Sequence, residues 1–172
     1  MGMALQIIVD GYNFIGKQKG LRGDMEGRRE ELIRLLARYR VVKGYSVTVV
    51  FDGERSGWPD EHGEIREGVH VVFSRHGESA DLVIDRMAQE LGNACIVVSS
   101  DREVARATQR SGGVAITISE FERRLAAALA HPFPKTREED REEPSVGIPK
   151  KGGNPRRLSK EERKKRLRLN KL

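Results

Sequence analysis

Short apolar runs alternate with longer amphipathic segments through the first 130 residues of the chain. Each run is a few residues long and rich in Val and Ile, which is typical of a strand buried on both faces and too short for a core helix. The expected strands are residues 6–9, 46–51, 69–73, 94–98 and 114–118. Strands that alternate with helices form parallel pairs, so the pattern predicts an α/β fold with a mostly parallel central sheet and helices on both faces.

Helical periodicity occupies the segments between these strands. The expected helices are residues 28–42, 80–91, 102–110 and 121–130. Ser79 stands where its side chain can cap the second helix, and Ser119 with Glu122 predicts a capping box before the last one. Residues 17–27 and 54–68 are polar, contain glycine and show no period, so we expect both segments to be loops.

The apolar period ends near residue 130, and the charge of the chain changes there. The sequence predicts a domain at residues 1–134, a charged linker at 135–149 and a basic tail at 150–172, with a capping-box pattern at Ser159 that predicts a helix in the tail. The whole chain has a net charge of +6, whereas the tail alone has 11 Lys/Arg and 2 Asp/Glu. This excess favours nucleic acid as a partner, and a membrane surface is less favoured because the tail lacks Trp and Phe.

Cysteine usage and the start of the chain bear on the compartment. Cys95 is the only cysteine and lies in an apolar run, so we expect a buried structural thiol and a reducing compartment. The apolar residues 4–9 are interrupted by Gln6 and stopped by Asp10, so they are too few for a signal peptide or a membrane span. The expected location is the cytoplasm, without membrane association.

Aspartates gather at the ends of the expected strands. Asp10, Asp52 and Asp101 each follow a strand, and Asp81 opens a helix. Because parallel strands end at the same edge of a sheet, we expect these four carboxylates to meet there. Like charges at short range repel one another unless a cation or protons neutralise them. Hard oxygen ligands suit Mg²⁺ or Mn²⁺, so we expect Asp10, Asp81 and Asp101 to bind such a metal and Asp52 to assist.

Carboxylates of this kind suit hydrolysis of a phosphodiester bond. Metal-bound water has a lowered pKa, and two ions can stabilise both the attacking and the leaving oxygen. Asn13, Ser99 and Ser100 are expected to orient the carboxylates or bound water. Arg75 is expected to hold a substrate phosphate, and an ion pair with Glu78 is its alternative.

Several of these residues also have simple structural explanations. An acid at Asp81, in the first turn of a helix, is favoured by the helix dipole alone, and Asp101 can cap the helix that follows it. Trp58, the single tryptophan, lies in the expected loop 54–68, where it can stack on a nucleobase or hold the loop against the domain. His62, in the same loop, is expected to face solvent.

Four ordered motifs carry a resemblance to a known family. They are Val9-Asp10-Gly11-Tyr12-Asn13, Val50-Phe51-Asp52-Gly53, Val72-Phe73-Ser74-Arg75 through Glu78-Ser79-Ala80-Asp81, and Val98-Ser99-Ser100-Asp101. Together they resemble the YacP-like NYN domain, within the PIN-like nuclease superfamily. The resemblance implies a PIN-like three-layer α/β fold and a metal-dependent endoribonuclease that acts on messenger RNA at the ribosome. It places the family's acidic positions at Asp10, Asp52, Asp81 and Asp101, with Asn13 beside the first. It covers about residues 4–130 and leaves out the basic extension after Pro149, which is expected to contact ribosomal RNA.

Three functions are considered for these residues. The first is a Mg²⁺- or Mn²⁺-dependent endoribonuclease whose substrate is bound by Arg75 and the tail. The tail residues expected to bind RNA are Lys150, Lys151, Arg156, Arg157, Lys164 and Lys165. The second is a non-catalytic RNA- or ribosome-binding module, in which the acids are helix caps or a vestigial site. A phosphate-transferring enzyme of the haloacid dehalogenase type needs a second acid two residues after Asp10, where Tyr12 stands, so it is set aside.

Overall fold

The computed structural model describes residues 4–19, 22–55, 57–130, 159–170 and 172. Contacts within the chain divide it into two compact units, residues 1–132 and 133–172. The expected linker at 135–149 lies outside the described residues. Four of the basic residues expected to bind RNA also lie outside them: Lys150, Lys151, Arg156 and Arg157. None of the helices within the described ranges is long and apolar enough to cross a membrane.

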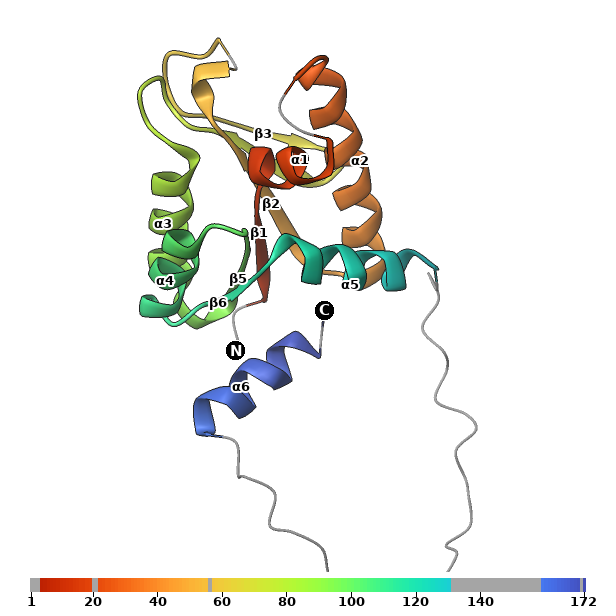
Figure 1. Ribbon diagram of the computed structural model, residues 1–172, viewed down its shortest axis with the longest axis vertical. Helices are drawn as coiled ribbons and strands as arrows, with labels where there is room; N and C mark the ends of the chain where they lie inside the picture. The colour runs from red at the N-terminus through yellow and green to blue at the C-terminus, as the bar shows by residue number, and fades with distance from the viewer. Residues whose placement is uncertain (1–3, 20–21, 56, 131–158, 171) are drawn as a thin grey trace, which may run out of the picture. The chain divides into compact units, whose positions relative to one another are not determined.

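A six-stranded sheet forms the centre of the first unit (Figure 1). Its strands are β1 Gln6–Asp10, β2 Ser46–Phe51, β3 His62–Arg66, β4 Val69–Phe73, β5 Cys95–Val98 and β6 Val114–Ile116. They lie in the order β3-β4-β2-β1-β5-β6, and every neighbouring pair is parallel except β3 with β4. The predicted α/β fold with a mostly parallel sheet is confirmed, and the five predicted strands are all present.

Strand β3 lies in a segment that the sequence predicted to be a loop. Residues 62–66 are mostly polar and exposed, and their one large apolar residue, Ile65, is itself exposed, so they lack the apolar run that marks the other strands. β3 pairs with β4 in an antiparallel hairpin through Glu67 and Gly68, both of which have positive φ. A tight turn of this kind needs such a conformation at both central residues. The strand therefore forms because the turn and the edge of β4 hold it, and the loop prediction was wrong there.

Helices cover both faces of the sheet. They are α1 Gly11–Lys19, α2 Met25–Lys43, α3 Ala80–Leu91, α4 Arg102–Arg110 and α5 Ile118–Ala130, with the short 3₁₀ helices η1 Gly53–Arg55 and η2 Gly92–Ala94. Figure 1 shows α3 and α4 on one side of the sheet and α1, α2 and α5 on the other. On the first side, Val83 and Ile84 pack against Ile8 and Val97 of the sheet. On the second side, the ring of Tyr39 of α2 packs edge-on against the ring of Phe121 of α5, with the ring centroids 5.3 Å apart. The expected three layers are present.

Helix boundaries differ from the prediction in two places. The expected loop at 17–27 is shorter, because α1 continues the chain from β1 and extends to Lys19, while α2 begins at Met25 with Asp24 as its cap. Helix α5 begins at Ile118, so the capping box expected from Ser119 and Glu122 is wrong. The first turn of α5 is capped instead by Thr117, whose hydroxyl accepts a hydrogen bond from the Glu120 N–H at 3.2 Å.

The second unit contributes one described helix, α6, at Lys160–Leu169. The predicted capping box is confirmed: the hydroxyl of Ser159 accepts from the Glu162 N–H, and the Glu162 carboxylate accepts from the Ser159 N–H. Lys164 and Lys165 lie on this helix and are exposed. No residue of this helix is buried.

Candidate active site

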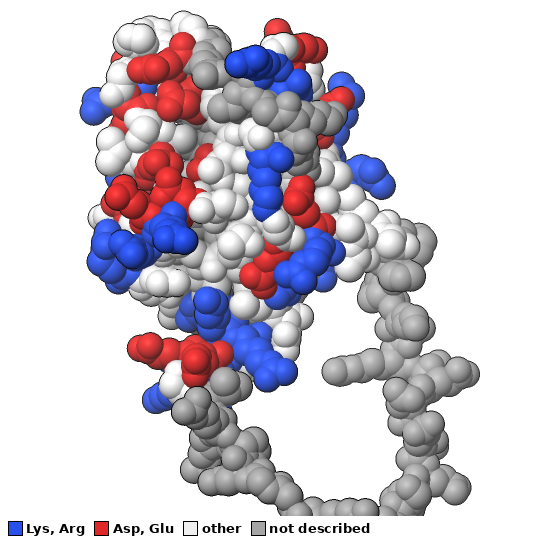
Figure 2. Space-filling model, viewed as in Figure 1, with Lys and Arg blue, Asp and Glu red and all other residues white. Residues whose placement is uncertain are grey.

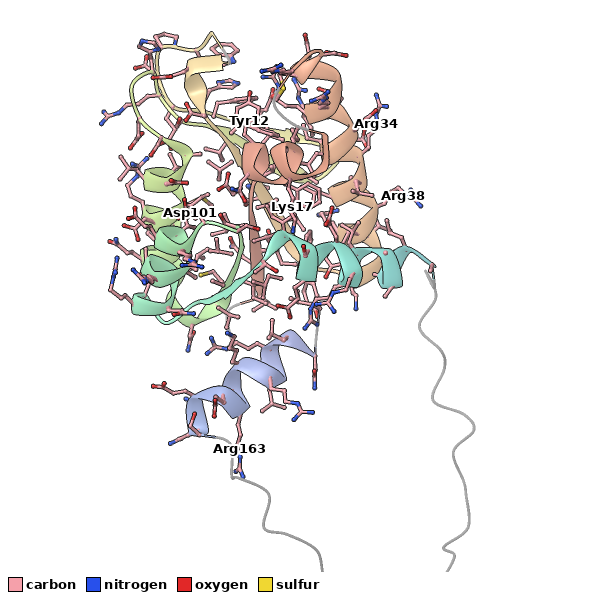
Figure 3. The ribbon with its side chains drawn as sticks, in the orientation of Figure 1. Tyr12, Lys17, Arg34, Arg38, Asp101 and Arg163 are labelled. Atoms are coloured by element: carbon pink, nitrogen blue, oxygen red, sulfur yellow. The ribbon has the colours of Figure 1, made fainter. Side chains whose placement is uncertain are left out.

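Four aspartates lie at the carboxyl edge of the sheet, and we call Asp10, Asp52, Asp81 and Asp101 the acidic edge. Asp10 is the last residue of β1, and Asp52 follows β2. Asp101 follows β5 after Ser99 and Ser100, and Asp81 is the second residue of α3. β1 lies between β2 and β5 in parallel register, so the three strands end side by side. Figure 2 shows acidic side chains gathered over α3, with basic side chains next to them over α4, and Figure 3 labels Asp101 at the start of α4.

Asp10 is the buried member of the acidic edge, with 6% of its surface exposed. Burial raises the pKa of its carboxyl to about 6, and the charges of Asp81 and Asp101 act in the same direction. Two hydrogen bonds oppose that shift: Ser99 Oγ donates to Asp10 Oδ2 at 3.1 Å, and the Asn13 N–H donates to Oδ1 at 3.4 Å. Asp10 therefore changes its charge close to neutral pH, in a site that repels its negative form.

Asp81 shows that the carboxylates act on one another. Its pKa is raised, first by desolvation and then by the charges of Asp101, Asp52 and Glu103. Among the described residues, no member of the acidic edge forms an ion pair with Lys, Arg or His. Negative charge is therefore concentrated here, and none of the cationic side chains that the structure describes forms an ion pair with it.

Glu103 belongs to this group, and the sequence reasoning missed it. It stands in the first turn of α4, two residues after Asp101, and its charge contributes to the raised pKa of Asp81. The signal was present in the sequence as a second acid close to Asp101. It was missed because an acid in the first turn of a helix is ordinarily explained by the helix dipole.

Asp101 has a structural role as well as a place at the edge. Its Oδ1 accepts from the N–H groups of Glu103 at 2.7 Å and Val104 at 3.3 Å, so the helix-cap interpretation is confirmed. Both bonds use the same oxygen, which leaves Oδ2 as the atom able to accept a further ligand. The cap fixes the direction of the side chain and so the position of that second oxygen.

Small polar residues tie the acidic edge together. The hydroxyl of Ser99 donates to Asp10 and accepts from the Asp101 N–H at 3.1 Å, so one side chain orients two acids. Asn13 Oδ1 accepts from the Ser100 N–H at 2.9 Å, which joins the start of α1 to the loop after β5. The structure thus brings Asn13, Ser99 and Ser100 next to the carboxylates that they were expected to orient.

A glycine follows each of the first two acids because the backbone is crowded there. A Cβ at Gly11 would lie 2.3 Å from the ring of Phe51, and one at Gly53 would lie 1.5 Å from the carbonyl oxygen of Ser74. Neither position has room for a side chain. The Gly53 N–H donates to Ser74 Oγ at 2.9 Å, and Asp52 Oδ1 accepts from the Glu54 N–H at 3.2 Å. These contacts set the turn that places Asp52 beside the end of β2.

The side chains as they stand do not complete a metal site. Within the described part of the chain, no three His, Cys, Asp or Glu side chains are grouped closely enough to hold an ion. The chemistry of the donors nevertheless fits a hard divalent cation, because carboxylate oxygens are its preferred ligands. Burial, and then the charges of neighbouring carboxylates, raise the pKa values of Asp10 and Asp81.

Arg75 and Glu78 lie beside the acidic edge but behave differently from it. Glu78 is buried and forms ion pairs with Arg86 and with Arg75, whose Nε lies 3.5 Å from Glu78 Oε2. The hydrogen bond from Arg86 is the main cause that lowers the pKa of Glu78. The ion-pair explanation of Arg75 is therefore confirmed. Its side chain remains 67% exposed, so contact with a phosphate is sterically open and stays a prediction.

Lys17 is a second charged residue that the sequence reasoning gave no role. It lies one helical turn after Asn13 on α1, and Figure 3 shows it pointing toward the start of α5. There its ammonium donates to the hydroxyl of Ser119. Lys17 was missed because the sequence predicted a loop from residue 17 onward, so its position on the same helix face as Asn13 had no basis.

The three-layer fold and the acids at its carboxyl edge define a PIN-like NYN domain, a class of nuclease domains. The chain belongs to the YacP-like NYN domain family, whose model matches residues 7–168. That match extends into α6, so the expectation that the family pattern leaves out the basic extension was wrong.

Individual relatives support the same assignment. The chain is 34% identical over 91 residues to a protein of Bacillus subtilis (strain 168) described as "Uncharacterized protein YacP". The match covers 51% of this chain and 53% of the relative, so the chain spans about half the length of that curated protein. Two crystal structures of Rae1 (YacP) from Bacillus subtilis also match. A mutant form has a TM-score of 0.62 at 29% identity, covering 73% of this chain and 77% of that one. The other has a TM-score of 0.59 at 28% identity, covering 74% and 76%.

Proposed function

We propose that this protein is a metal-dependent endoribonuclease that cleaves phosphodiester bonds of RNA, with messenger RNA at the ribosome as its substrate. One observation carries the proposal. Four aspartates from four separate segments converge on one sheet edge, and no cation of the described residues balances them. Such an arrangement is costly for stability, and it is useful if a divalent metal and a phosphate bind there. Membership in a family of nuclease domains supports the same conclusion.

The ligands of the metal are Asp10, Asp81 and Asp101, with Asp52 assisting. A bound Mg²⁺ or Mn²⁺ supplies an activated water and neutralises charge on the reacting phosphate. The chain's own contribution is to position the carboxylates: Ser99 holds the Asp10 carboxylate through its hydroxyl, and the cap bonds of Asp101 leave Oδ2 for the ligand. Because Asp10 has a pKa of about 6, metal binding is expected to weaken in acid as this carboxyl takes up its proton.

Basic residues supply affinity for the RNA. Arg75 stands next to the acidic edge with an exposed guanidinium, which suits a phosphate flanking the bond that is cut. Lys164 and Lys165 lie exposed on α6, and the remaining basic residues of the tail add to a counterion-release contribution that is independent of RNA sequence. Action at the ribosome follows from the family resemblance, and the tail is the part of the chain suited by charge to ribosomal RNA.

The experiment that tests the proposal removes one charge at a time. Asp10→Asn and Asp81→Asn keep the size of each side chain, and each is expected to lower Mn²⁺-stimulated cleavage of a labelled RNA by at least about a hundredfold. Binding of the same RNA should remain. Glu90→Gln is the matched control, since Glu90 is an exposed acid at the far end of α3 from Asp81. Undiminished cleavage by both Asn variants would show that these carboxylates do not carry the reaction.

The alternative is a non-catalytic module that binds RNA or the ribosome. The cap role of Asp101 favours it, as does the lack of three grouped ligands among the described residues. It predicts salt-sensitive RNA binding by the unaltered protein and no cleavage with Mg²⁺ or Mn²⁺ at any pH. Cleavage that depends on Asp10 excludes this alternative.

A further inference from the structure

Trp58 is the only tryptophan of the chain, and 48% of its surface is exposed. Its ring lies almost parallel to that of His62, with the ring centroids 4.1 Å apart and 11° between the planes. A tryptophan that mainly holds a loop against a domain buries most of its surface. The exposure of Trp58 therefore points to a ligand with a flat, apolar face.

The position of this pair relates it to the acidic edge. β3 runs antiparallel to β4, so it begins where β4 ends, and His62 lies opposite Phe73 in the register. β4, β2 and β1 end at that same edge, which places the start of β3 three strands away from Asp10. At a strand spacing of roughly 4.8 Å, this separation is about 14 Å along the edge. A few nucleotides of a single strand span such a distance.

The segment that carries Trp58 is fixed to the segment that precedes α3. The carbonyl oxygen of Pro59 accepts from the His76 N–H at 3.2 Å. Arg86 of α3 forms ion pairs with both Glu61 and the buried Glu78. These contacts hold the aromatic pair in place relative to the helix that carries Asp81 at its start. A platform that is already ordered loses little conformational entropy when it binds a ligand.

Charge near the platform suits a nucleic-acid strand. Arg75 follows β4, the strand that lies between β3 and β2, and its side chain is 67% exposed. A strand that runs along the edge from Trp58 to Asp10 crosses the end of β4, which Arg75 follows two residues later. One phosphate between the stacked base and the reacting bond can therefore be neutralised.

We propose that Trp58, backed by His62, stacks on an unpaired nucleobase of the RNA a few nucleotides from the bond that is cut. This inference rests on the proposed function and adds the residues that hold the RNA beside the acidic edge. A base inside a duplex has both faces covered by its neighbours and cannot stack on the indole, whereas an unpaired base can. Stacking tolerates any of the four bases, so the platform selects for strandedness and not for sequence.

The single tryptophan makes the contact measurable directly. The probe is a six-nucleotide oligo(rA), titrated into the full chain without added divalent metal so that no cleavage is needed. Trp58 emission is expected to fall as the oligonucleotide binds. An abasic ribose-phosphate chain of the same length and charge, and a blunt G·C-rich RNA duplex long enough to stay paired, should leave the emission unchanged. Binding of oligo(rA), seen by anisotropy of an end label, with no change in emission would overturn the inference.

Variants separate stacking from a role in holding the loop. Trp58→Ala and Trp58→Leu should each weaken oligo(rA) binding by at least about fivefold, while Trp58→Phe keeps most of the affinity because it keeps a flat ring. Equal affinity of the Leu and Phe variants contradicts stacking.

The outcome of this test is independent of catalysis. If the unaltered protein cleaves RNA and Trp58→Ala cleaves single-stranded RNA with the same KM, the stacking inference fails and the nuclease stands. If oligo(rA) quenches Trp58 emission but the unaltered protein cleaves no RNA, the nuclease proposal is rejected and the stacking inference stands.

Discussion

Asp10 and Glu78 are buried to nearly the same degree, with 6% and 7% of their surfaces exposed, but the pKa values of their carboxyl groups move in opposite directions. Glu78 lies between Arg86 and Arg75, and the hydrogen bond from Arg86 lowers its pKa. Asp10 has no such cation among the described residues, and burial with the charge of Asp81 raises its pKa to about 6. Burial alone does not decide the charge of an acid, because the neighbouring charges can outweigh it.

The two regions are joined by one side chain. Ser74 Oγ accepts from the Gly53 N–H, next to Asp52, and donates to the carbonyl oxygen of Glu78 at 2.6 Å. Through these two backbone contacts, this serine links the turn that carries Asp52 to the backbone of Glu78. A group left uncompensated by its own fold is the kind expected where a ligand binds.

Among the variants that test the contrast between Asp10 and Glu78, replacement of Asp10 should change the stability most. The pKa of Asp10 is about 6 in the folded chain, against 3.8 for an ordinary aspartate. Between these pH values the folded state still binds a proton that the unfolded state has lost, so the free energy of unfolding falls as pH rises. Asp10→Asn removes that loss, which is about 3 kcal/mol for a shift of this size. In metal-free buffer the variant should be more stable than the unaltered protein at neutral pH and equally stable below pH 4 or so. Urea unfolding at the two pH values measures it.

The same variant should lose cleavage, so stability and activity move in opposite directions. Glu90→Gln serves as the control and should change neither. If Asp10→Asn is less stable than the unaltered protein at neutral pH, the carboxylate is satisfied within the fold, and the contrast with Glu78 is lost.

Divalent metal should stabilise the protein through the acidic edge. A cation that binds only the folded state stabilises it by about 2.7 kcal/mol at one hundred times its Kd. Mn²⁺ is therefore expected to raise the melting temperature of the unaltered protein, and to do so less at pH values below the Asp10 pKa of about 6, where this carboxyl is protonated. Calorimetry with Mn²⁺ and with EDTA tests this. If Mn²⁺ raises the melting temperatures of Asp10→Asn and Asp81→Asn as much as that of the unaltered protein, the ion binds elsewhere.

Neutralising Glu78 should have a smaller effect, of opposite sign at neutral pH. The pKa of Glu78 is lowered in the folded chain, so its contribution to stability is present above the pKa of an unfolded glutamate and disappears as pH falls through the folded value. Glu78→Gln is expected to destabilise the protein at neutral pH by less than Asp10→Asn stabilises it, and the difference should vanish in acid. Arg86→Gln is the matching variant on the other side of the pair. Higher stability of Glu78→Gln at neutral pH would contradict this account.

The tail should give the smallest effect per residue. Both Lys164 and Lys165 lie on α6. Replacing either one with Gln should weaken RNA binding slightly. If the lysine contacts a phosphate, the slope of log K against log salt should become shallower by about 0.7 to 0.9 per substitution. Neither variant should change the pH dependence of stability that Asp10 produces. Titrations at several salt concentrations measure the slope. An unchanged slope in the double variant would assign these lysines another role.

Much of the fold and of the acidic edge was readable in the sequence. β-branched runs mark β1, β2, β4, β5 and β6 because most of their residues are buried, and the alternation with helices implies parallel pairing. Acids that follow parallel strands must meet at one edge, so the meeting of Asp10, Asp52 and Asp101 was expected. β3 was missed because its residues are mostly polar and exposed, and α1 because its short sequence has no clear apolar stripe.

The sequence by itself determined which acids stand at strand ends and that glycine follows Asp10 and Asp52, because these are properties of short segments. Only the tertiary structure decided that Glu78 is neutralised while Asp10 is not, and that Trp58 lies on His62 at the same edge. Arg86 reaches Glu78 and Glu61 only once α3 has packed beside the hairpin of β3 and β4. Charge partners separated along the chain are set by packing, and packing also sets the pKa values and the exposed stacking face.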